Sequence, residues 1–278
     1  MSEFRHLIFN LSKPIMQEKI KFYQIDAFTN KLFSGNPACV VPLNTWLEDS
    51  VLLNIAKENA VPETAFFTIQ ENGIHLRWFT PDIEMDLCGH ATLASAHCII
   101  QHMDYGKAEL EFKTLSGTLK VNHRNGMYFL DFPSRPAKKT ALPNQIKNAL
   151  SMPPLEVYKA RDYLLLYETE LDVQNLRVNR QLFDQINLGT GGVIITSKGK
   201  TVDFVSRFFT PQASILEDPV TGSAHCSLIP FWAERIQKQK MNALQLSERG
   251  GELSCELVGD SVLIGGEACT YAEGYLNI

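Results

Sequence analysis

Apolar residues recur along the first half of the chain with two different periods. Short runs rich in β-branched and aromatic residues predict strands at 21–28, 38–41, 64–69, 74–79 and, as three short strands, 110–132. Apolar residues at helical spacing predict helices at 48–60 and 89–102. The second helix is rich in alanine and has almost no polar face, so we expect a sheet to wrap around it and bury it.

The second half of the chain shows a similar mixture of elements. Helices are predicted at 145–150, 180–186 and 222–236, and strands at 155–159, 163–167, 193–196, 202–209 and, with glycine turns, 244–278. Strands and helices do not alternate as regular β-α-β units, and hairpin signals are frequent. The pattern therefore favours an α+β fold, with a mostly antiparallel rolled sheet around a central helix in each half.

One passage of the sequence occurs twice. Residues 77–97 read R-W-F-T-P-D-I-E-M-D-L-C-G-H-A-T-L-A-S-A-H, and the chain from Arg207 reads R-F-F-T-P-Q-A-S-I-L-E-D-P-V-T-G-S-A-H-C-S. Arg207 lies 130 residues after Arg77, whereas Gly222 lies 133 residues after Gly89, so the second copy holds three additional residues. Two copies are too few for a solenoid. The repeat instead predicts two pseudosymmetric domains that face each other.

The repeat and the turn signals together predict the domain limits. We expect an N-terminal extension at 1–19, a first domain at 20–133 and a second domain at 134–269. The final strand near 270–278 is a candidate to return to the first domain. The extension lacks the continuous apolar stretch of a signal peptide, and no segment reaches the roughly 20 apolar residues needed to span a membrane.

Composition narrows the class of partner. The chain is 45% hydrophobic and 21% charged, which is typical of a soluble globular protein. Its net charge of −5 gives no indication of nucleic-acid or membrane binding, so a small molecule is the expected partner. The six cysteines are dispersed and lack the spacing of a structural zinc site. This favours reduced thiols, a cytoplasmic location and no bound metal.

Both copies of the repeat place a glycine and a polar residue at the start of a predicted helix. These pairs are Gly89-His90 and Gly222-Ser223. The first amides of a helix lack acceptors within the helix and lie at the positive end of its dipole. Two such helix ends across a cleft would bind a small carboxylic acid. The alternative is that both pairs are only capping residues, but their occurrence at matched positions favours the binding site.

Glu63 is the candidate proton carrier. It stands directly before the apolar run Ala65-Phe66-Phe67, and a carboxylate against apolar side chains has the raised pKa that a general base near pH 7 requires. The alternative is a surface glutamate at the start of a strand. The corresponding part of the second half is the run 189–192, G-T-G-G, which has no ionisable group. Only one half therefore supplies a base.

Two further residues are candidates for the same site. Asp218 is assigned to the three-residue insertion, without a partner in the first copy, and it precedes Pro219. Its alternatives are a turn-and-cap residue or a hydrogen-bond partner for a substrate amine or hydroxyl. His90 is either a structural histidine or a proton carrier at the start of its helix. Its matched position after Cys88-Gly89 favours the second interpretation.

These motifs resemble those of the phenazine biosynthesis PhzF-like family, a branch of the diaminopimelate epimerase-like fold. They are Y-Q-I-D-A-F-T-N-K-L-F-S-G-N-P-A from Tyr23, E-T-A-F from Glu63, R-W-F-T-P with L-C-G-H-A-T, and E-D-P-V-T-G-S-A-H from Glu217. The resemblance extends from about residue 20 to the end of the chain. It implies two pseudosymmetric domains with the active site between them, no metal or organic cofactor, and a homodimer.

The resemblance also implies roles for individual residues. Glu63 matches the catalytic acid/base of the family, and His90, Asp218 and Ser223 match its other active-site positions. In the type member the glutamate moves a proton between two carbons of a dihydro-hydroxyanthranilate ring. We assign substrate binding to Gly89, Gly222, Thr221 and Asn36. The family precedent does not identify the substrate or pathway of this chain.

Related amino-acid epimerases use two cysteines as opposed bases. In this chain Cys88 occupies the first place, but the glycine alignment puts Thr221 at the second, and a hydroxyl without an activating partner is a poor base. The sequence therefore predicts a cofactor-independent isomerase that moves a proton on a small carboxylic acid with Glu63. Two alternatives remain: an amino-acid epimerase or racemase that uses Cys88, and a non-catalytic protein that binds a small carboxylate.

Overall fold

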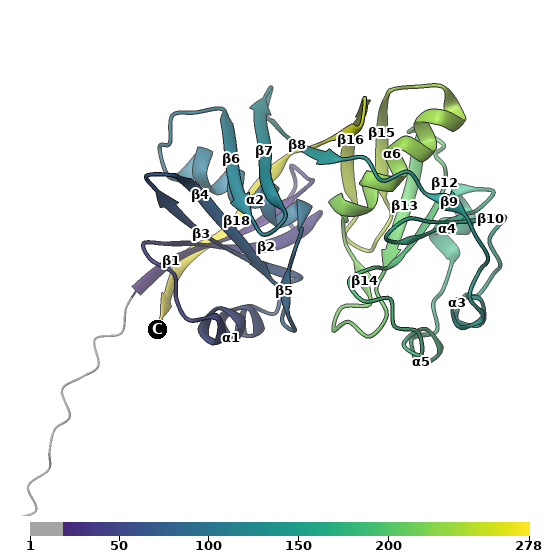
Figure 1. Cartoon of the computed structure of the whole chain (residues 1–278), viewed down its shortest axis with the longest axis horizontal. Coiled ribbons are helices and arrows are strands. Elements are labelled where there is room, and N and C mark those ends of the chain that lie inside the picture. Colours follow the sequence, from purple (N-terminus) through teal and green to yellow (C-terminus); the bar gives the residue numbers. More distant parts are fainter. Residues whose placement is uncertain (1–18) are drawn as a thin grey trace, which may run out of the picture.

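The computed structural model describes residues 19–278, and they form two lobes side by side (Figure 1). The extension expected at 1–19 lies outside the described residues except for Lys19, which already begins the first strand. We call residues 19–133 with the C-terminal strand the N-lobe and the rest the C-lobe. No helix within residues 19–278 is long and apolar enough to cross a membrane.

The N-lobe contains eight strands and two helices before the chain crosses to the other lobe. In order they are β1 (Lys19–Ala27), β2 (Asn36–Leu43), α1 (Asp49–Asn59), β3 (Glu63–Gln70), β4 (Gly73–Phe79), β5 (Glu84–Met85), α2 (Gly89–His102), β6 (Glu109–Thr114), β7 (Gly117–Arg124) and β8 (Met127–Pro133). The two helices differ in position, because α2 lies within the lobe and α1 on its outside (Figure 1).

The C-lobe repeats this order with additional short helices. Its elements are β9 (Lys138–Lys139), α3 (Asn144–Ala149), β10 (Glu156–Lys159), β11 (Tyr163–Leu166), α4 (Glu170–Asn175), α5 (Arg180–Phe183), β12 (Val193–Lys198), β13 (Phe204–Phe209), β14 (Glu217–Asp218), α6 (Gly222–Ile236), β15 (Lys240–Gln245), β16 (Gly251–Val258), β17 (Ser261–Gly266) and the returning β18 (Ala268–Asn277). The central helix of this lobe is α6.

Strand pairing follows the same scheme in both lobes. The parallel pairs β2–β3 and β4–β6 of the N-lobe correspond to β11–β12 and β13–β15 of the C-lobe. The hairpins β3–β4, β4–β5, β6–β7 and β7–β8 correspond to β12–β13, β13–β14, β15–β16 and β16–β17. Most pairs are antiparallel, as the sequence predicts, and the fold is α+β.

Two exchanges of strands connect the lobes. β18 crosses back and pairs antiparallel with β1 along its whole length, from Lys19 opposite Asn277 to Ala27 opposite Ala268. β17 pairs antiparallel with β8, so the last strands of the two lobes form one continuous ladder. The joined strands lie between the lobes in Figure 1. The C-terminal segment therefore stabilises both lobes and holds them at a defined distance.

The two central helices share one hydrophobic core. Every residue of α2 from Gly89 to Ile99 is buried, and α6 is buried nearly as completely. Pro230 lies inside α6 and has no N–H to donate to the carbonyl of Cys226. The backbone N–H of Arg135, in the crossing between the lobes, donates to that carbonyl at 2.8 Å. The proline thus anchors the interlobe crossing to the central helix.

The sequence predictions and the observed elements differ at short segments. The helix α4 is missing from the prediction, although Thr169 and Asp172 form a capping box at its start. The helix predicted at 180–186 ends at Phe183, and β15 begins at Lys240 rather than at 244. Short helices of one or two turns contain too few apolar positions to establish a period, which explains these misses.

Candidate active site

The first residues of α2 and α6 meet at the centre of the molecule. A Cβ atom added to Gly89 would lie 3.0 Å from the Cα of Gly222, and one added to Gly222 would lie 3.1 Å from the Cα of Gly89. Both contacts are with backbone, which cannot move aside as a flexible side chain can. The repeated glycines are therefore required because the two helix ends touch.

Cys88 and Thr221 are the N-cap residues of these two helices. Both have extended backbones, and neither caps its helix with its side chain. The first amides of each helix are therefore not satisfied by the N-cap side chain, and they lie at the positive end of the helix dipole. The two helix ends together form a region where a negatively charged group would be stabilised.

A cavity of about 610 Å³ lies at this junction. Seven of the eight residues predicted for the site line it, namely Glu63, Gly89, His90, Asp218, Thr221, Gly222 and Ser223. Apolar side chains such as Met85 and Phe208 and the loops after β4 and β13 form much of the remaining wall. The loops touch where the Ser214 hydroxyl donates to Asp82 Oδ2 at 2.6 Å. The volume is that of a small-molecule site.

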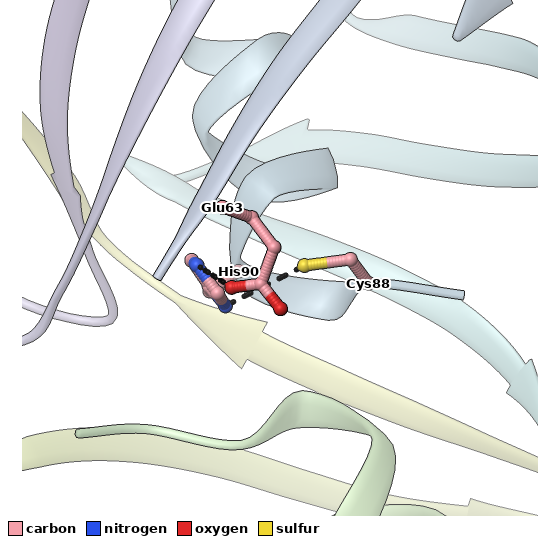
Figure 2. A group of neighbouring side chains, drawn as sticks. All are labelled: Glu63, Cys88 and His90. Atoms are coloured by element: carbon pink, nitrogen blue, oxygen red, sulfur yellow. Dashed lines mark hydrogen bonds and ion pairs between the residues drawn. The ribbon is translucent and has the colours of Figure 1, made fainter. Parts of the chain in front are cut away.

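Glu63 and His90 form the polar centre of the N-lobe wall. Glu63 begins β3, and its Oε2 lies 3.2 Å from Nε2 of His90, the second residue of α2 (Figure 2). Both atoms are buried, and neither has a well-formed hydrogen bond with any residue of 19–278. Such atoms are costly unless a further group completes their hydrogen bonding. A carboxylate and an imidazole thus remain available to a ligand.

The pKa of His90 lies well above its ordinary value. Burial of the ring acts to lower this pKa, whereas the neighbouring Cys88 sulfur and Glu63 carboxylate act to raise it, with the larger net effect. The charged imidazolium is consequently favoured at neutral pH beside a carboxylate. The pair can exchange a proton across the short contact between Nε2 and Oε2.

Cys88 is poorly suited to act as a base. Its sulfur lies 3.6 Å from His90 Nδ1, and burial, followed by the nearby Glu63 charge, raises the pKa of the thiol to about 11. A thiol with this pKa is neutral at pH 7 and therefore a weak nucleophile and base. The C-lobe has Thr221 at the matched position. Neither helix end offers a thiolate.

The same three side chains are of the kind that bind transition metals, and their ligand atoms lie within 4.8 Å of one another. The carboxylate, however, faces Nε2 of the His90 ring and the sulfur faces Nδ1 (Figure 2). An imidazole gives one nitrogen to one ion, so these atoms do not surround a common point in this arrangement. The absence of a metal from the reaction stays a prediction.

Asn36 holds this wall from behind. Its side-chain nitrogen donates to Asp218 Oδ1 at 2.6 Å and to the Val220 carbonyl at 2.8 Å, and lies 3.1 Å from His90 Nδ1. Asn36 is fully buried and is not part of the cavity wall. The sequence assigns it to substrate binding. Its position instead fits a residue that connects Asp218 to His90.

Asp218 has a place in the repeat, which corrects the sequence interpretation. In the N-lobe Trp78 pairs with Met85, and in the C-lobe Phe208 pairs with Asp218. Asp218 therefore corresponds to Met85, and the three additional residues lie earlier, in the loop 211–216. The sequence alignment could not place the gap because no residue identity exists between the two prolines and the two glutamates except by choice of gap.

The carboxyl group of Asp218 titrates close to neutrality. Burial raises its pKa to about 6, opposed by the His90 charge and reinforced by the Glu63 charge. The Thr221 hydroxyl donates to Asp218 Oδ2 at 2.6 Å, and Gln245 in turn donates to Thr221 Oγ1 at 3.1 Å. Asp218 is thus held in place on both oxygens and changes its protonation near pH 6.

Arg161 is a wall residue that the sequence does not indicate. It lies in the turn between β10 and β11 and lines the cavity, and its Nη2 donates to Ser223 Oγ at 2.9 Å. Ser223 itself is the second residue of α6 and is buried. Arg161 belongs to neither copy of the repeat and is 62 residues from Ser223 in sequence. A single sequence offers no signal for a contact of this kind.

Comparisons with known proteins agree with this arrangement. The sequence profile of the family described as phenazine biosynthesis-like protein matches residues 25–274. An uncharacterized isomerase from Pseudomonas aeruginosa is 44% identical over 261 residues, which are 94% of this chain and 99% of that protein. The crystal structure of a PhzF family phenazine biosynthesis protein from Enterococcus faecalis is similar with a TM-score of 0.89 and 40% identity, covering 94% of this chain and 100% of that one.

A more distant structural similarity concerns the fold alone. A hydroxyproline epimerase from Agrobacterium vitis, solved with bound trans-4-hydroxy-L-proline, shares a TM-score of 0.61 at 9% identity, covering 94% of this chain and 93% of that one. The two-lobed architecture with paired central helices is therefore common to isomerases of different sequence. With its family profile, its relatives and its diaminopimelate epimerase-like fold, the chain belongs to the phenazine biosynthesis-like PhzF family of isomerases.

Proposed function

We propose that the protein is a cofactor-independent isomerase that moves a proton on a small carboxylic acid, with Glu63 as the acid/base. The observation that supports this most directly is the buried Glu63 Oε2, which faces the cavity beside His90 Nε2 at 3.2 Å without a completed hydrogen bond. A general base must reach its substrate proton within hydrogen-bond distance, and this oxygen is free to do so.

In this proposal the substrate carboxylate lies at the junction of the two central helices. The backbone N–H groups after Gly89 and Gly222 would donate to it, because both helix ends direct positive charge toward the cavity. Removal of a proton next to a carboxylate creates an enolate-like charge, and preorganised donors stabilise that charge in the transition state. His90 would receive or return the proton through Glu63, while Asp218 and Ser223 would hold the polar groups of the substrate.

The test is exchange of a carbon-bound proton with solvent. The protein is incubated in heavy water with a panel of small amino and hydroxy acids, and loss of a C–H signal is followed by NMR. Glu63→Gln should remove this exchange without unfolding the protein. Glu71→Gln, which changes an exposed turn residue by the same group, is the matched control. Exchange at the original rate in Glu63→Gln would show the assignment to be wrong.

The two alternatives have their own outcomes in the same experiment. An epimerase that uses Cys88 requires this thiol, so complete loss of exchange in Cys88→Ala would support it, against the pKa of about 11. A non-catalytic binding protein would bind a carboxylate from the panel and never exchange solvent deuterium into it. The unpaired Glu63 oxygen favours the isomerase, because binding of an anion alone does not need a carboxylate in the wall.

We further propose that the protein acts in the cytoplasm as a homodimer. Support for the compartment comes from the cysteines, since all six are free thiols and five of them are buried. Support for the dimer comes from resemblance to the family. Light scattering coupled to size-exclusion chromatography measures the mass directly, and 31.3 kDa would indicate a monomer.

A further inference from the structure

The second residue of each central helix is held by a side chain from the other end of its lobe. In the N-lobe Asn36, at the end of the β1–β2 connection, lies 3.1 Å from the ring of His90. In the C-lobe Arg161, at the end of the β10–β11 connection, donates to Ser223 Oγ at 2.9 Å. The two contacts occupy matching places in the repeated topology. They differ in charge, because one residue is a neutral amide and the other a guanidinium.

Arg161 is held firmly in its orientation. Its Nε and Nη2 atoms donate to Oδ2 of Asp162, at 3.3 Å and 3.1 Å. The Asp162 carboxylate is buried and also accepts the backbone N–H of Gly192 at 2.8 Å. A guanidinium anchored on one edge by a fixed carboxylate presents its remaining N–H groups in a defined direction.

This orientation determines what the Ser223 hydroxyl can do. A guanidinium can only donate hydrogen bonds, so Ser223 Oγ must accept from Arg161. The proton of the same hydroxyl is then directed elsewhere. The hydrogen bonds of Arg161 use Nε and Nη2, which leaves Nη1 without a partner among the described residues although the side chain is 20% exposed and lines the cavity. Ser223 and Arg161 therefore both offer donors to a ligand.

We propose that Arg161 determines substrate specificity by making its part of the cavity a binding position for an anionic oxygen and a poor one for an ammonium group. The inference rests on the proposed function, since it concerns the same cavity, and it orients the substrate there. A carboxylate would lie against Arg161, Ser223 and the start of α6. Groups that donate, such as an amine or hydroxyl, would lie against the acceptors Glu63 and Asp218.

The test compares two probes of equal ring size and opposite charge, benzoate and benzylammonium, by NMR titration of the full-length protein. Wild type should bind benzoate about tenfold or more tightly than benzylammonium. Arg161→Met should lose most of this preference, about tenfold in the affinity for benzoate. Arg161→Lys should recover part of it, because the charge remains but the planar fork is lost.

Two controls separate this role from general effects of charge and folding. Arg235→Met removes the same charge from the C-lobe surface, where Arg235 pairs with Glu156 outside the cavity, and should leave both affinities unchanged. Ser223→Ala combined with Arg161→Met should cost less than the sum of the single changes, since both remove parts of one hydrogen-bonded unit. Thermal unfolding and circular dichroism show whether each variant is folded, and Arg161→Gln replaces any variant that is not.

Several results would overturn the proposal. These are equal binding of the two probes to wild type, no benzoate binding up to tens of millimolar, unchanged preference in folded Arg161→Met, or equal losses in Arg235→Met. Failure of the proposed function looks different. If Glu63 is not the proton carrier, deuterium exchange survives in Glu63→Gln, whereas the preference for benzoate and its loss in Arg161→Met remain.

Discussion

The two lobes have the same frame and different chemistry. Each lobe ends its β4-type strand in a two-pronged ion pair, Arg77 with Glu84 and Arg207 with Glu217, and the Nε–Oε1 distance is 2.7 Å in both. Each lobe also begins its central helix with a glycine in contact with the other. These repeated residues set the position of the two helix ends. Residues in contact with the cavity are where the lobes diverge.

The divergence gives the site its direction. Glu63 at the start of β3 faces the cavity, whereas the matching segment before β12 consists mainly of glycine. His90 corresponds to Ser223, and the neutral Asn36 behind it corresponds in place to the cationic Arg161. The N-lobe thus contributes a proton carrier and acceptors, and the C-lobe contributes donors. A symmetric pair of lobes would suit opposed bases, while this pair suits one base and one anion site.

The largest effect is expected when the asymmetry itself is removed. Glu63→Gln should lower the rate of solvent exchange by about 10²- to 10⁴-fold, the usual contribution of a general base. Cys88→Thr, which makes the N-lobe helix end equal to Thr221 of the C-lobe, should leave the rate within a few-fold. NMR exchange rates measured side by side decide the comparison. Equal losses in both variants would mean that the thiol takes part.

The repeated glycines allow a symmetric test of the frame. Gly89→Ala and Gly222→Ala should each destabilise the protein by roughly 1 to 3 kcal/mol, because each new Cβ overlaps the opposite backbone. Urea unfolding measures the loss. We expect similar values for the two variants because the contact is reciprocal. A tolerated alanine at either position would show that the helix ends can separate without cost.

The matched positions Thr92 and His225 differ in their response to pH. Both side chains donate to the carbonyl of their N-cap residue, Thr92 to Cys88 and His225 to Thr221. Burial, partly offset by the Thr221 carbonyl, lowers the pKa of His225 to about 4. A lowered folded-state pKa means that the unfolded chain binds the proton more tightly, so stability is fully present above about pH 6.5 and falls between there and pH 4.

Replacement of this histidine should flatten the pH dependence. His225→Gln should reduce the loss of unfolding free energy between pH 7 and pH 5 by about 2 kcal/mol, as follows from the pKa difference. Urea unfolding at the two pH values gives this number, and Thr92→Ser provides the control at the matched position without a titratable group. An unchanged slope in His225→Gln would assign the acid sensitivity to other residues.

The smallest difference is expected between the two ion pairs. Arg207 also donates to the carbonyls of Val173 and Leu176 at the end of α4, whereas Arg77 additionally contacts the exposed Asp49. Arg207→Met should therefore cost more than Arg77→Met, by about 1 kcal/mol, since it leaves buried carbonyls unpaired. Thermal or urea unfolding of the two variants gives the difference. The reverse order would mean that α4 does not depend on this arginine.

The sequence predicted the long elements well and the short ones poorly. Both central helices have the predicted limits, Gly89–His102 and Gly222–Ile236, because a glycine start followed by more than three turns of small and apolar residues leaves little ambiguity. The six-residue helix α4 was missed although its capping box is visible in the sequence. Local signals of one turn compete with many similar arrangements in loops, whereas a long period does not.

The predictions for the site depended on the repeat. Matching glycines led to the helix ends, and seven of the eight predicted residues line one cavity. Asp218 was placed in the wrong part of the repeat, because only the pairing of β13 with β14 shows where the additional residues lie. Arg161 was missed because its contact with Ser223 joins positions that are distant in sequence and lie outside any motif.

The sequence by itself determined that this protein consists of two related halves, which two helices lie at their centres, and that only one half has a carboxylate next to the site. These properties follow from periodicity, repetition and residue chemistry, which are local. The tertiary structure alone decided that Glu63 faces His90, that Asn36 stands behind the wall and that Arg161 orients Ser223. Such contacts depend on how two sheets curve and meet, and no short segment of the chain encodes that geometry.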